Sequence, residues 1–209
     1  ADFMDLAFTL AFKYRMPAMI LSDGVIGQMM EKVVLPPVKP RRTEEEIKKE
    51  CPWSTFGRTP DRKPNIITSL EWQPEVMEIR NQKLLKKYEL VKENEIRYDT
   101  SQCEDADYLF VAFGSAARIS EKAMELAREA GLKVGLFRPI TLWPFPEKEI
   151  AEAAKKLKGI LVAEINAGMM IEDVRLAVNG TVRCEHYGRL GGIVPEPEEM
   201  VKALKEKFL

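Results

Sequence analysis

A polar group follows the first apolar run of the chain. Asp23 and Gly24 come directly after the apolar residues 18–21, and Gln28 lies about one helical turn further on. Ligand sites in open α/β sheets gather at the carboxyl ends of strands, so polar residues after a buried strand are candidates for such a site. Asp23 has two readings here. Its carboxylate either caps the helix that follows or faces a site shared with other polypeptide.

Two further polar groups end apolar runs in the second half of the chain. Glu164 and Asn166 close the run 160–165, with the same ambiguity as Asp23. His186, the single histidine, ends the run 182–186. It has no evident serine or cysteine nucleophile and no second metal ligand at helical spacing. We therefore favour a satisfied, partly buried histidine over a catalytic one, and we assign no catalytic and no metal-binding residue.

Two glycine-containing junctions could bind an anion. Residues 113–116 (FGSA) stand where a strand is expected to meet a helix, and the free N–H groups of a helix start attract anions. The GxGxxG spacing of a dinucleotide site is absent, however, which favours a tight turn with Ser115 as the helix cap. Residues 188–192 (GRLGG) offer backbone amides in the same way, but a flexible turn is the safer reading.

A rigid aromatic loop and three cysteines complete the candidates. Residues 138–146 (RPITLWPFP) combine prolines with two aromatic side chains, which fits a packed loop and a docking surface for a partner or sister domain equally well. Cys51, Cys103 and Cys184 are far apart and lack CxxC spacing. They therefore predict no zinc site, no iron–sulfur cluster and no disulfide framework, and a reducing cytoplasm is the default.

Composition excludes several classes of function. The chain has 209 residues, with 32 Lys+Arg against 33 Asp+Glu, and this balance argues against a nucleic-acid-binding protein. No apolar run approaches the roughly 20 residues that span a bilayer, so we expect no membrane partner.

The elements that must position these residues alternate regularly from residue 107 onward. Apolar runs typical of strands alternate with amphipathic segments typical of helices, which predicts a mostly parallel sheet covered on both faces. The expected strands are 108–113, 133–137, 160–165 and 182–186, and the expected helices are 116–130, 148–157, 169–178 and 196–208. The predicted class is therefore a three-layer α/β domain over residues 104–209.

The first 103 residues have a different character. Residues 3–14 predict a buried helix capped by Asp2, and the run 18–21 predicts a strand buried on both faces. Because one helix and one strand cannot form a core, residues 1–35 are expected to be the last αβ unit of a larger domain. Residues 36–103 are expected to form a linker, poor in regular structure over the proline-rich part 36–72 and ending in an amphipathic helix over 74–93.

Several strings resemble the alpha subunit of 2-oxoacid:ferredoxin oxidoreductases, in its C-terminal portion. The string 6–33 (LAFTLAFKYRMPAMILSDGVIGQMMEKV) is similar to the end of the pyrimidine-binding domain for thiamine diphosphate. The following domain of that subunit, which is itself similar to the C-terminal domain of transketolase-like enzymes, is matched by FGSAARIS, FRPITLWPFP, EINAGMMIEDVRLAV and HYGRLGGIVPEPEE. The stretch 65–98 resembles the 2-ketoisovalerate type more than the pyruvate type.

The resemblance implies a complex in which a 2-oxoacid is oxidatively decarboxylated to an acyl-coenzyme A with reduction of ferredoxin. It implies thiamine diphosphate with Mg held mostly by other polypeptide and a beta subunit, and iron–sulfur clusters held by gamma and delta subunits. It makes Asp23, Gly24 and Gln28 the residues expected nearest the cofactor or substrate, and it makes this chain non-catalytic alone. Two alternatives stay open: a stand-alone small-ligand or nucleotide-binding module that uses the edge at Gly114, and a purely structural interaction domain.

Overall fold

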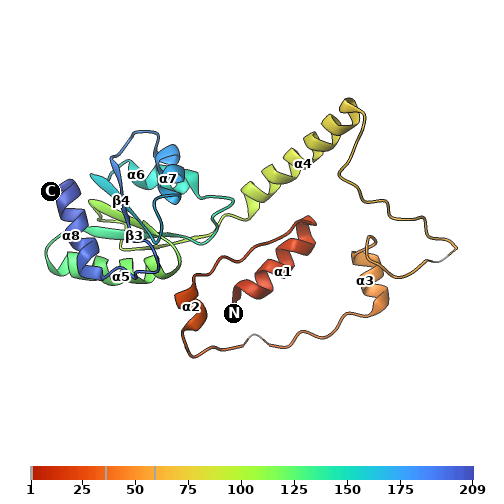
Figure 1. Cartoon of the computed structure of the whole chain (residues 1–209), viewed down its shortest axis with the longest axis horizontal. Helices are drawn as coiled ribbons and strands as arrows, with labels where there is room; N and C mark the ends of the chain where they lie inside the picture. The colour runs from red at the N-terminus through yellow and green to blue at the C-terminus, as the bar shows by residue number, and fades with distance from the viewer. Residues whose placement is uncertain (1, 36, 59) are drawn as a thin grey trace. The chain divides into compact units, whose positions relative to one another are not determined.

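The computed structural model (Figure 1) describes residues 2–35, 37–58 and 60–209. The chain divides into two units. Unit 1 comprises Ala1–Ile20 and Glu31–Lys87, and unit 2 comprises Leu21–Met30 and Tyr88–Leu209. Ala1, Pro36 and Thr59 lie outside the described residues, and so does any expectation that includes them.

A five-stranded sheet forms the centre of unit 2. Its strand order is β1-β3-β2-β4-β5. The strands β2 to β5 run parallel, whereas β1 pairs antiparallel with β3 at one edge. The strands are β1 (Tyr98–Ser101), β2 (Tyr108–Ala112), β3 (Val134–Pro139), β4 (Gly159–Glu164) and β5 (Cys184–Gly188).

Helices cover both faces of the sheet and give three layers (Figure 1). The helices α5 and α8 pack together, as do α6 and α7. The four helices are α5 (Gly114–Glu129), α6 (Glu147–Ala154), α7 (Met170–Val178) and α8 (Pro197–Phe208). The expected fold class, a mostly parallel α/β sheet, is confirmed.

The strand β2 shows why this sequence needs two helical layers. Successive side chains of a strand point to opposite faces. Tyr108, Phe110 and Ala112 pack in the core that contains α5 and α8 residues, while Leu109 and Val111 pack in the core that contains α6 and α7 residues. Every residue of β2 is buried, so a continuous apolar run is the pattern expected of this central strand.

Unit 1 has little regular structure besides helices. It contains α1 (Asp2–Tyr14), α3 (Glu44–Glu50) and most of α4 (Pro74–Asn94), whose last turns belong to unit 2. The expectation that 36–72 lacks regular structure is wrong for α3. This short helix carries a capping box, in which Thr43 and Glu46 satisfy each other's backbone N–H groups.

Two expectations for the first 35 residues are not met. Residues 18–21 form no strand, because the described chain places no neighbouring strand beside them to complete the backbone hydrogen bonds. The helix α1 contains no buried residue, and its Phe8 side chain is 63% exposed. The apolar pattern thus correctly predicts a helix here, but not the burial that we expected for it.

Candidate functional site

The neighbouring strands β2 and β4 define the place in the sheet where a ligand site is most expected. Ala112 at the end of β2 lies opposite Ala163 near the end of β4. From there the chain enters α5 after β2 and α7 after β4, and these two helices belong to opposite layers. In open α/β sheets, ligand sites are found outside the carboxyl ends of the strands at such a switch point. Asp23, Ser115 and Glu164 lie at this end of the sheet. His186, which was predicted to end its strand, instead lies in the middle of β5 and pairs with Val162.

Asp23 joins two helix starts through its carboxylate. Its Oδ1 accepts a hydrogen bond of 2.8 Å from the backbone N–H of Ile26, which makes Asp23 the N-cap of α2 (Gly24–Gln28). Its Oδ2 accepts hydrogen bonds from the Ser115 hydroxyl at 2.5 Å and from the Ser115 backbone N–H at 3.4 Å. Burial opposes the charge, but the hydrogen bonds from Ser115 and Ile26 outweigh it and lower the pKa of Asp23. The capping reading of Asp23 is confirmed.

Gly24 and Gln28 are the two ends of α2, and both are exposed. They can border a cofactor, but with Asp23 they do not enclose one, and the Asp23 carboxylate is already engaged by protein donors. Within the described ranges, no group of three His, Cys, Asp or Glu side chains is placed to hold a metal ion. The three residues therefore do not fit a complete site for Mg and thiamine diphosphate, and no chemical step is derived through that cofactor.

The junction at Gly114 differs from the expected cap. The helix α5 begins at Gly114, two residues earlier than predicted, and its N-cap is Phe113, which makes no side-chain cap. Gly114 has φ +58°, a conformation that L side chains rarely adopt, so glycine suits this turn out of β2. Because Ser115 lies inside the first turn, its hydroxyl is directed to Asp23 and does not cap α5. The predicted role of Ser115 as a helix cap is wrong.

Glu164 is a buried carboxylate with a structural partner. It is 2% exposed, and its oxygens accept hydrogen bonds from the backbone N–H groups of Met170 at 2.9 Å and Ile171 at 3.1 Å. The N–H of Met169 and the amide of Asn166 also donate to it. A negative charge at a helix N-terminus is stabilised by the free N–H groups and the helix dipole. Glu164 therefore anchors the start of α7.

His186 lies beside Glu164 without a close bond to it. The distance from His186 Nε2 to Glu164 Oε1 is 3.9 Å, and this nitrogen is buried with no hydrogen-bond partner among the described residues. Burial lowers the pKa of His186, and the nearby Glu164 carboxylate offsets this only in part. The histidine is partly buried, as predicted. The prediction that its ring nitrogens find hydrogen-bond partners is wrong for Nε2.

The segment after β5 is anchored rather than free. The Glu199 carboxylate accepts a hydrogen bond from the Tyr187 hydroxyl at 2.8 Å and pairs with Arg189, also at 2.8 Å. Burial, followed by this hydrogen bond to Glu199, raises the pKa of Tyr187 to about 12. At Gly188 an added Cβ would lie 2.3 Å from the carbonyl oxygen of Asn166, so no side chain fits there. Beyond Arg189, Gly191 and Gly192 both have positive φ, a turn conformation that favours glycine, and the flexibility expected of this turn stays a prediction.

The two aromatic side chains of the loop 138–146 differ in burial. Phe145 is buried, whereas Trp143 is 52% exposed and makes an edge contact with Tyr88, with ring centroids 5.5 Å apart. The packed-loop reading therefore fits Phe145, and the docking-surface reading stays a prediction.

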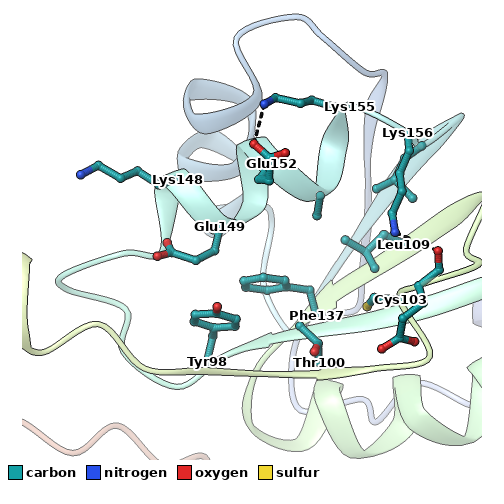
Figure 2. Close-up of a pocket in the computed structure, with 13 residues that line it drawn as sticks. Tyr98, Thr100, Cys103, Leu109, Phe137, Lys148, Glu149, Glu152, Lys155 and Lys156 are labelled. Carbon is teal, nitrogen blue, oxygen red and sulfur yellow. Dashed lines mark hydrogen bonds and ion pairs between the residues drawn. The ribbon is translucent and has the colours of Figure 1, made fainter.

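An open groove that sequence reasoning missed lies elsewhere in unit 2 (Figure 2). It has a volume of about 650 Å³ and runs between β1 and α6. Tyr98 and Phe137 stack along it with centroids 5.0 Å apart, and the half-buried Cys103 lies in its lining. Its charged side chains balance: Lys148, Lys155 and Lys156 against Glu104, Glu149 and Glu152. The residues come from separate elements with no shared motif, so the sequence held no signal for the groove.

The sheet domain is similar to one domain of a known enzyme family. Residues 106–200 match the family model of the pyruvate:ferredoxin oxidoreductase core domain II. A structure of the 2-oxoglutarate:ferredoxin oxidoreductase from Magnetococcus marinus aligns with a TM-score of 0.56 and 24% identity, covering 66% of this chain and 24% of that chain. This second likeness supports the fold.

Two relatives are similar to this chain along nearly its whole length. The ketoisovalerate oxidoreductase subunit VorB of Methanothermobacter marburgensis is 38% identical over 200 residues, covering 96% of this chain and 55% of the relative. The 2-oxoglutarate synthase subunit KorA of the same organism is 28% identical, covering 97% of this chain and 60% of the relative. The resemblance to subunits of 2-oxoacid:ferredoxin oxidoreductases is thereby confirmed. The chain spans little more than half the length of these relatives.

Within the described residues, no helix has the length and apolarity that crossing a membrane requires.

Proposed function

We propose that this chain is part of the alpha subunit of a thiamine-diphosphate-dependent 2-oxoacid:ferredoxin oxidoreductase. The observation that supports the proposal is the 38% identity to a ketoisovalerate oxidoreductase subunit along 96% of the chain. In such a complex, thiamine diphosphate supplies the chemistry of decarboxylation, coenzyme A takes up the acyl group, and iron–sulfur clusters pass electrons to ferredoxin. The beta subunit and further polypeptide would hold the cofactor with Mg, and gamma and delta subunits would hold the clusters.

The role proposed for this chain is to shape the surroundings of the active site rather than to catalyse. Its two best-placed carboxylates at the carboxyl edge, Asp23 and Glu164, already serve as helix anchors through hydrogen bonds to backbone N–H groups. Both oxygens of each carboxylate already accept hydrogen bonds from protein donors, which leaves little capacity to take a proton from a substrate. Asp23, Gly24 and Gln28 are the residues that we propose border the cofactor or substrate.

A branched-chain 2-oxoacid is the proposed substrate. The support is the difference in similarity between the two kinds of relative, 38% identity to the ketoisovalerate subunit against 28% to the 2-oxoglutarate subunit.

The test is a substrate comparison on the reconstituted complex. The subunit that carries this chain would be coexpressed with its beta, gamma and delta partners. Reduction of ferredoxin would then be measured with 2-ketoisovalerate, pyruvate and 2-oxoglutarate, each with and without coenzyme A. We expect the highest kcat/KM with 2-ketoisovalerate, dependence on coenzyme A, and no activity of this chain alone. Preference for 2-oxoglutarate would refute the substrate class, and reduction that no 2-oxoacid supports would refute the enzyme class.

A further inference from the structure

The segment Leu21–Met30 is held to the sheet domain by a contact distant in sequence. Asp23 and Ser115 are 92 positions apart, yet the Ser115 hydroxyl lies 2.5 Å from Asp23 Oδ2. The backbone N–H of Ser115 reaches the same oxygen at 3.4 Å. Both donors point to a carboxylate whose other oxygen caps α2. One side chain thus connects the first turn of α2 with the first turn of α5.

From this geometry we propose that Ser115 is a positioning residue, which holds Asp23 and thereby fixes α2, with Gly24 and Gln28, at the carboxyl edge of the sheet. The inference rests on the proposed function, since it concerns the same three residues that we place beside the cofactor or substrate.

The construction of α2 explains why it needs such a hold. The helix has five residues and buries none of its side chains. Helices this short are unstable in water by themselves, because too few backbone hydrogen bonds offset the cost of starting the helix. Ser115, in contrast, is 7% exposed and sits in a helix that is packed on the sheet. The hydrogen bond therefore joins α2, which has no buried side chain, to α5, which is packed in the core.

The chemistry of the bond suits this role. A hydroxyl that donates to a carboxylate makes a charge-assisted hydrogen bond, which is shorter and stronger than a neutral one. The lowered pKa of Asp23 keeps the carboxylate charged throughout the neutral pH range, so the hold persists there.

Hydrogen–deuterium exchange on the full chain, followed by kinetics of the complex, tests the proposal. Ser115→Ala removes the hydroxyl, Ser115→Thr retains it, and Asp23→Ala removes the acceptor. Ser120→Ala is the matched control, because Ser120 lies on the same helix, is fully buried, and has no hydrogen-bond partner for its hydroxyl in the described structure. For Ser115→Ala and Asp23→Ala we expect amides 24–29 to exchange about tenfold faster, the change expected for losing a hydrogen bond to a charged group. Ser115→Thr and Ser120→Ala should retain the original rate.

In the reconstituted complex, Ser115→Ala should lower kcat, Ser115→Thr should restore it, and Ser120→Ala should leave it unchanged. Unchanged exchange in Ser115→Ala would overturn the positioning role, even if Asp23→Ala, which also loses the N-cap of α2, exchanged faster. Faster exchange together with unchanged kcat and KM would leave the hold in place but refute the placement of residues 24–28 beside the reacting groups. The two ideas can therefore fail separately.

Discussion

Individual side chains at the carboxyl edge show what residue type alone does and does not reveal. Asp23 and Glu164 both come at the end of an apolar run. Each carboxylate accepts hydrogen bonds from backbone N–H groups of the helix that follows. The sequence could predict the cap at Asp23, because the partner Ile26 is three residues away. It could not predict the bond to Ser115, since that contact depends on how α2 packs against α5.

His186 makes stability depend on pH. Burial holds its folded-state pKa below the usual value of about 6.5, despite Glu164, while Lys207 and Arg175 lower it further. The unfolded chain therefore binds a proton more readily, so this contribution to stability is present at higher pH and is lost as the pH falls through the unfolded pKa. We expect the free energy of unfolding, measured in urea, to decrease from about pH 8 to pH 6. His186→Gln should flatten this decrease, and an equal slope in the variant would contradict the prediction.

At the scale of elements, the helices and strands of unit 2 were largely predictable because apolar periodicity and burial agree there. The run over β2 is buried throughout and was identified from its sequence. The strand β1 was missed because its residues, Tyr98–Ser101, are mostly exposed and polar, and only pairing with β3 makes them a strand. The converse error occurred at residues 18–21, where an apolar run without a pairing partner stays irregular.

The start of α7 should depend on the charge of Glu164. Glu164→Gln leaves a neutral amide, with a single acceptor oxygen, to meet the N–H groups of Met170 and Ile171. We expect this to cost about 1.5–3 kcal/mol of unfolding free energy, the range for hydrogen bonds to a charged group. Glu172→Gln is the control, because Glu172 lies in the same first turn but is exposed. Chemical denaturation measures both, and equal losses in the two variants would contradict the role assigned to Glu164.

At the scale of the whole molecule, the two units differ in how much core they possess. Unit 2 contains two buried clusters, one for each helical layer. Helix α1 of unit 1 contains no buried residue, although Phe3, Phe8 and Phe12 are all on it. The apolar residues nearly all round this segment predicted a buried helix, but burial depends on neighbours that the local pattern does not specify.

This difference predicts unequal local stability along the chain. Helices without buried contacts open easily, whereas central strands open only on global unfolding. We expect amides of α1 to exchange with deuterium at least 100-fold faster than those of β2, a span that corresponds to about 2.7 kcal/mol. Exchange followed by mass spectrometry on this chain would measure it. Comparable protection of α1 and β2 would show that α1 has a packing partner in solution.

The antiparallel direction of β1 determines where the covalent connections of unit 2 are made. Tyr98 pairs with Pro139 at the carboxyl end of β3, so the chain that leaves α4 enters the sheet at the carboxyl ends of the parallel strands. The segment around Asp23 is attached at the same end of the sheet. The amino ends of the parallel strands carry the short turns at Gly131, before β3, and at Gly180, before β5. An added Cβ at either glycine would meet nothing within 4 Å. A fluorophore or affinity tag inserted in those turns would therefore report on the protein from the side remote from its proposed working surface.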